Sequence, residues 1–128
     1  MANTVDMVVV VTTGKQDRGA RATLALSWAS AALALGKSVS LFFTMDGTEW
    51  MMRGAMQGVQ VAGYEPLESY FEQFVSLGGH PIVCAPCSEY FCRYDRNAVM
   101  ESIIPEARLG GLSTVVSMIS RGTSVVTF

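Results

Sequence analysis

Short hydrophobic runs, separated by longer segments rich in Ala, Leu or aromatic residues, define the pattern of this chain. The run Met7–Val11 places four valines in succession without polar alternation, which is typical of a strand buried on both faces of a parallel sheet. Shorter apolar runs predict further strands over residues 39–44, 82–84 and 123–128. The strands are therefore expected to belong to the interior of an α/β protein.

The segments between these runs predict helices. Residues 20–35 are rich in Ala and Leu and stop at Gly36, a residue favoured just beyond a helix C-terminus. Pro66 stands at the first turn of a helix predicted over residues 66–77. Further helices are predicted over residues 48–57, 97–104 and 112–120. This alternation predicts an α/β fold, a three-layer α/β/α sandwich around a mostly parallel sheet of about five strands.

The length of 128 residues suits one domain over residues 1–128. The amino terminus lacks a basic segment, and its longest apolar run is too short for a signal peptide or a membrane span. An odd number of clustered cysteines does not suit a secreted disulfide framework. We therefore expect a cytoplasmic protein that does not enter a membrane.

The composition indicates association between copies. Half of the residues are hydrophobic and only 16% are charged, which leaves more apolar surface than a monomer usually exposes. The helix over residues 20–35 is apolar on several sides, since Leu24, Leu26 and Trp28 cannot share one stripe. The methionines at positions 45, 51, 52 and 56 are interpreted as adaptable packing at an interface. We expect a homo-oligomer.

The charge of the chain gives no reason to expect a nucleic-acid partner. The formal net charge is −2, and the nine Lys and Arg residues are scattered, whereas a phosphate-binding surface needs a dense basic patch.

The chemistry of the chain is concentrated in one short segment. Cys84 ends the apolar strand 82–84, and Cys87 and Cys92 follow it where a helix is predicted to start. Ligands of parallel α/β sheets bind outside the carboxyl ends of the strands, and the turns at residues 12–19 and 44–47 are expected at the same edge. Backbone N–H groups at a helix start favour a thiolate. Cys84 is therefore the predicted nucleophile.

The chain resembles the DsrE/DsrF/TusD-like sulfur-relay proteins of the DsrEFH superfamily. The resemblance lies in the first strand with its Thr-Gly turn and Ala-rich helix, and in residues 32–47, 82–84, 109–113 and 125–128. It implies that a cysteine at the position of Cys84 accepts a persulfide sulfur from a donor protein and passes it to an acceptor. It also implies a trimer or hexamer. No cofactor is expected.

Three interpretations of the cysteine cluster remain open. In a persulfide carrier, Cys84 attacks a sulfane sulfur, and Cys87 relays that sulfur or resolves it as a disulfide. In a metal site, His80, Cys84, Cys87 and Cys92 supply nitrogen and sulfur ligands with the spacing H-x3-C-x2-C-x4-C. Against the metal site, an extended strand separates His80 from Cys84. In the third interpretation the cysteines are small core residues of a non-catalytic oligomeric module.

Overall fold

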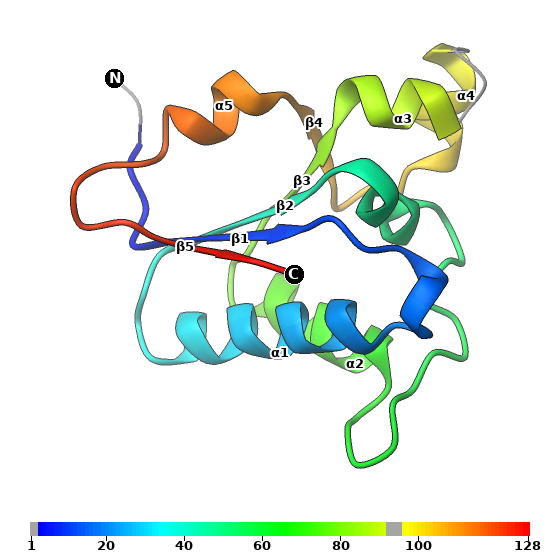
Figure 1. The fold of residues 1–128 in the computed structure, drawn as a ribbon, viewed down its shortest axis with the longest axis horizontal. Helices are drawn as coiled ribbons and strands as arrows, with labels where there is room; N and C mark the ends of the chain where they lie inside the picture. The colour runs from blue at the N-terminus through cyan, green and yellow to red at the C-terminus, as the bar shows by residue number, and fades with distance from the viewer. Residues whose placement is uncertain (1–2, 92–95) are drawn as a thin grey trace.

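A parallel sheet forms the centre of the protein. The computed structural model describes residues 3–91 and 96–128, and within these residues five parallel strands pair in the order β4-β3-β2-β1-β5 (Figure 1). The strands are β1 (Met7–Val11), β2 (Val39–Phe43), β3 (Pro81–Cys84), β4 (Arg108–Gly110) and β5 (Ser124–Thr127). The predicted sheet and its approximate number of strands are confirmed.

Helices cover both faces of this sheet. On one face lie α1 (Ala20–Ala34) and α2 (Leu67–Ser76), and on the other lie α3 (Ala85–Phe91) and α5 (Leu112–Val116), with α4 (Arg96–Ser102) beside α3 (Figure 1). The predicted three-layer α/β/α sandwich is therefore confirmed. No helix in the described part of the chain is long and apolar enough to cross a membrane.

Alternate residues of the central strands belong to two apolar clusters, one on each face of the sheet. Val9 of β1 pairs in register with Leu41 of β2, and both are fully buried against α1 and α2. Val8 and Phe42 point to the opposite face and pack with Val115 of α5. Burial on both faces explains why β1 contains a continuous apolar run rather than an alternating one.

The segment after β2 differs from its prediction. Residues 48–57 were expected to form an α-helix, but the chain forms a 3₁₀ helix over Met45–Met51 and then turns. Positive φ angles at Met45 (51°) and Gly54 (77°) limit the helical stretch. Met51 and Met56 are buried in the core. Interpreting these two methionines as interface residues is therefore wrong.

The carboxyl-terminal third contains a strand that the sequence did not reveal. No strand was predicted between the helices over 97–104 and 112–120, but Gly110 pairs with Cys84 as the last residue of β4. A Cβ atom on Gly110 would lie 2.7 Å from the Cγ2 atom of Ile82, so glycine lets β4 approach β3 closely. The predicted helices over 97–104 and 112–120 are shorter, at Arg96–Ser102 and Leu112–Val116.

Candidate functional site

The turn after β2 is held tightly against the end of β1. The backbone N–H of Thr44 donates to the carbonyl oxygen of Val11 at 3.0 Å, and the N–H of Gly47 donates to the carbonyl of Thr44 at 2.9 Å. A Cβ atom on Gly47 would lie 2.1 Å from the carbonyl oxygen of Val11. Only glycine fits there, so the path of residues 44–47 is fixed by backbone contact.

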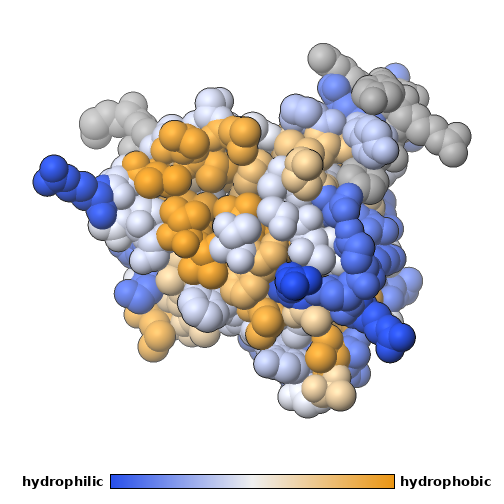
Figure 2. Space-filling model, viewed as in Figure 1, coloured by the Kyte–Doolittle hydropathy of each residue, from blue (hydrophilic) through white to orange (hydrophobic). Residues whose placement is uncertain are grey.

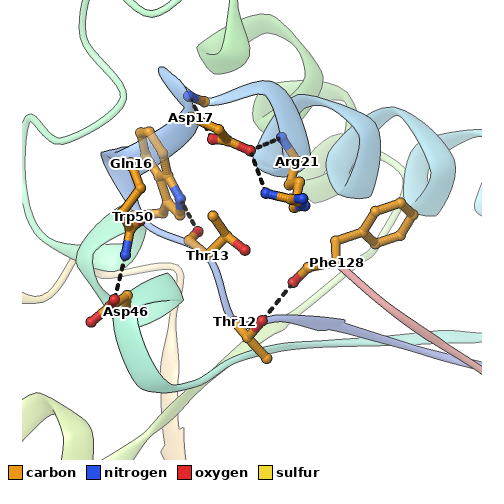
Figure 3. Close-up of polar contacts among 9 residues, drawn as sticks. Thr12, Thr13, Gln16, Asp17, Arg21, Asp46, Trp50 and Phe128 are labelled. Atoms are coloured by element: carbon orange, nitrogen blue, oxygen red, sulfur yellow. Dashed lines mark hydrogen bonds and ion pairs between the residues drawn. The ribbon is translucent and has the colours of Figure 1, made fainter.

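Side chains attach the loop after β1 to the same 3₁₀ helix. The Trp50 indole N–H donates to the carbonyl of Thr13 at 2.8 Å, and the Gln16 amide donates to the carboxylate of Asp46 (Figure 3). Trp50 is almost completely buried. The loops that follow β1 and β2 therefore form one connected wall at the carboxyl edge of the sheet.

Cys84 ends β3 and faces the interior. Only 6% of its surface is exposed, and its side chain packs in the cluster of Val8 and Phe42. Burial raises the pKa of the Cys84 thiol, and the hydrogen bond that the thiol shares with Cys87 raises that pKa further. The backbone N–H of Cys87 and the Thr44 side chain act in the opposite direction without reversing the shift. Cys84 is thus the less acidic thiol of the pair.

Cys87 lies in the first turn of α3 and is half-buried. The backbone N–H of Met45 donates to its Sγ atom at 3.2 Å, and the Oγ1 atom of Thr44 lies 3.7 Å from Sγ. Burial by itself raises the pKa of the Cys87 thiol. Hydrogen bonds from Cys84, Thr44 and the Met45 N–H, together with the nearby Thr48 hydroxyl, outweigh burial, so the pKa of Cys87 falls below its ordinary value.

A surface cavity of about 350 Å³ opens beside Cys87. Its wall is formed by Met45 and Asp46 from the turn after β2 and by Pro86, Cys87 and Tyr90 from α3. Cys84 does not line this cavity. A sulfur compound that enters the cavity therefore meets Cys87 first.

The structure brings together two of the predicted site residues and separates a third. Cys84 and Cys87 are in contact as free thiols. His80 is exposed and precedes β3, whereas Cys84 ends this strand, about 13 Å away at the rise of an extended chain. Among the described residues no group of three or more His, Cys, Asp or Glu side chains is arranged to hold a metal ion. A site that includes His80 with the cysteines is therefore not assembled, and Cys92 lies outside the described residues.

Sequence reasoning missed the polar partners of the thiols. Thr44, Met45 and Thr48 lie about forty residues before Cys87, and no motif links them to it. The only signal was topological, since the turn after β2 was expected at the same sheet edge as the cysteines.

Fold and site define a class: an α/β/α protein with paired thiols at the carboxyl edge of a parallel sheet. The sequence model of the DsrE/DsrF-like family matches residues 6–128, and the chain belongs to this family. The crystal structure of the ychN protein from E. coli is similar over 100% of both chains, with a TM-score of 0.71 and 16% identity. That likeness concerns the fold alone. No curated protein matches the chain.

Proposed function

We propose that this protein is a sulfur-relay protein that carries a sulfane sulfur as a persulfide on the Cys84–Cys87 pair. Membership of the DsrE/DsrF-like family supports sulfur relay. The observation that carries the proposal is the pairing of a half-buried thiol of lowered pKa with a buried thiol of raised pKa. Such a pair combines a nucleophilic thiolate with a neighbouring proton donor.

The transfer needs no external oxidant or reductant. A thiolate attacks the outer sulfur of a donor hydropersulfide, so that Cys–S⁻ and R–S–SH give Cys–S–SH and R–S⁻. One sulfur–sulfur bond forms while another breaks. A thiolate of an acceptor protein then attacks the outer sulfur of the loaded cysteine in the same way and restores the free thiolate. Donor and acceptor are therefore thiol compounds or thiol proteins.

Intact-mass spectrometry tests this function. The reduced protein is incubated with an alkyl hydropersulfide under anaerobic conditions, and we expect a mass gain of one sulfur atom per chain. The variant that carries both Cys84→Ser and Cys87→Ser should not gain this mass. The control is Cys92→Ser, which keeps Cys84 and Cys87 and should load. Equal loading of the double variant, or no loading of the parent protein, contradicts the proposal.

The same proposal includes assembly of several copies in the cytoplasm, as a trimer or a hexamer. The face of β1 and β5 opposite α1 is covered by one short helix, α5, and Val125 of β5 is 51% exposed. Figure 2 shows an apolar patch over α5 and β5, where Leu112, Val116 and Ile119 are also exposed. Parallel sheets are normally covered on both faces, so a second copy of the chain is the occupant that this patch fits.

A further inference from the structure

Three groups that can donate hydrogen bonds, from the turn and the 3₁₀ helix after β2, lie near the Sγ atom of Cys87. The Met45 N–H lies at 3.2 Å and the Thr44 hydroxyl at 3.7 Å. The Thr48 hydroxyl is close enough to lower the pKa of Cys87. Thr48 is completely buried, yet its Oγ1 atom has no hydrogen-bond partner of normal length in the described part of the protein.

A buried hydroxyl without a partner is destabilising, so each such group needs a physical explanation. A sulfur atom added to Cys87 would supply the missing hydrogen-bond partner of Thr48. The outer sulfur of a persulfide extends about 2.05 Å beyond Sγ and is anionic when deprotonated. Donors that are already in place stabilise such an anion without reorganisation.

The turn holds these donors in place before any sulfur arrives. Met45 adopts a left-handed φ of 51°, which is uncommon for a residue other than glycine. The contact between Gly47 and the Val11 carbonyl fixes the next residues of the turn. A strained backbone conformation of this kind is retained only where surrounding contacts hold it in place, and it is often found at functional sites.

We propose that Cys87, rather than Cys84, accepts the sulfur, and that Thr44, the Met45 N–H and Thr48 form an anion-binding cradle for the Cys87 persulfide. This inference rests on the proposed function and assigns its roles. Cys87 attacks the outer sulfur of the donor, and Cys84 remains protonated and donates its hydrogen bond to Cys87. Cys84 is only 6% exposed and does not line the cavity, so a donor in the cavity cannot reach it directly.

The cavity also indicates the class of donor. Met45, Pro86 and Tyr90 present mainly apolar surface, and Asp46 adds a carboxylate. A negative charge in the cavity wall disfavours an anionic donor such as thiosulfate. An alkyl hydropersulfide, of the type formed on a cysteine side chain, reacts in its neutral, protonated form and therefore fits this wall better. We therefore expect loading from an alkyl hydropersulfide to exceed loading from thiosulfate at equal concentration.

The cradle is tested first without any sulfur donor. The rate at which iodoacetamide alkylates each cysteine of the reduced full chain is followed against pH by peptide mass spectrometry. Among the described residues, the titratable groups that face Cys87 besides the cradle are Cys84 from β3, Asp46 from the 3₁₀ helix and Tyr90 from α3. In the parent protein, the pH at which the alkylation rate of Cys87 reaches half of its maximum (the midpoint) should be lower than the corresponding pH for Cys84.

A matched pair of valine variants isolates the Thr48 hydroxyl. Thr48→Val should shift the Cys87 midpoint upward. Thr23→Val should not, although Thr23 in α1 is equally buried and also has an unpartnered hydroxyl. Identical Cys87 profiles in these two variants, or a lower midpoint for Cys84 than for Cys87, would overturn the cradle.

Sulfur loading then separates this inference from the function on which it rests. Cys84→Ser should load from the alkyl hydropersulfide, Cys87→Ser should not, and Thr48→Val should load about tenfold more slowly, as expected for the loss of one hydrogen bond to a charged group. If Cys87→Ser loads like the parent, the inference fails while sulfur relay stands. If no variant loads, the parent included, the proposed function itself fails.

Discussion

The backbone N–H of Met45 lies 3.2 Å from the Sγ atom of Cys87, although 42 residues separate the two in the sequence. Met45 follows β2 and Cys87 follows β3, and these strands are direct neighbours in the sheet. Their carboxyl ends therefore meet at one edge, where the turn of one strand supplies the hydrogen bonds of the other strand's thiol. The reactivity of Cys87 depends on the position of this turn.

Gly47→Ala should disturb the site through the backbone. Because the new Cβ atom would lie 2.1 Å from the Val11 carbonyl oxygen, the turn must move. We expect a loss of about 1–3 kcal/mol in the free energy of unfolding, measured by urea titration. The Cys87 alkylation midpoint should also rise as the Met45 N–H moves away. Gly122→Ala is the control, since nothing lies within 4 Å of a Cβ at that position; equal stability of the two variants would contradict the prediction.

Mild oxidation with diamide should join Cys84 to Cys87 within one chain. The two thiols share a hydrogen bond, and a thiolate beside a thiol forms a disulfide readily once an oxidant accepts the electrons. Mass spectrometry under denaturing, non-reducing conditions should show the loss of two hydrogens and protection of both cysteines from alkylation. Cys92→Ser should behave like the parent. Oxidation that yields only disulfide-linked dimers would show that the pair cannot approach closely enough.

Val125→Glu should weaken assembly if copies meet at the patch over α5 and β5. A carboxylate buried in an apolar interface is costly, so the variant should shift from a trimer or hexamer toward smaller species in light scattering. Leu77→Glu is the matched control, because Leu77 is similarly exposed, at 47%, but follows α2 on the opposite side of the sheet. A parent protein that is monomeric at micromolar concentration would refute the assembly.

Asp6 should contribute to the pH dependence of stability. The backbone N–H of Ser38 donates to the Asp6 carboxylate at 2.9 Å and, together with the Ser38 hydroxyl, holds the pKa of Asp6 below its ordinary value. A lowered folded-state pKa gives stability that is present above the unfolded value and lost as the pH falls through the folded value. The difference in urea midpoint between the parent and Asp6→Ala should therefore be largest near neutral pH and shrink in acid. A difference that does not change with pH would exclude this contribution.

The elements that the sequence predicted well are those whose burial is uniform along the element. β1 and β2 are covered on both faces, so their apolar runs carry the information locally. β4 has three residues, and Arg108 and Leu109 are exposed. No hydrophobic pattern marks such a strand, because its position results from the pairing of its backbone with β3.

The sequence by itself determined the α/β/α class, the family resemblance and the place of the cysteines at a strand end, because these follow from local periodicity and chain order. Only the tertiary structure decided which thiol is the more acidic. Cys84 and Cys87 are three residues apart in the chain, but their pKa values shift in opposite directions. The difference arises because one thiol is buried in the core, whereas the other receives hydrogen bonds from Thr44 and Met45 and lies near the Thr48 hydroxyl. Such long-range contacts exist only once the sheet has formed.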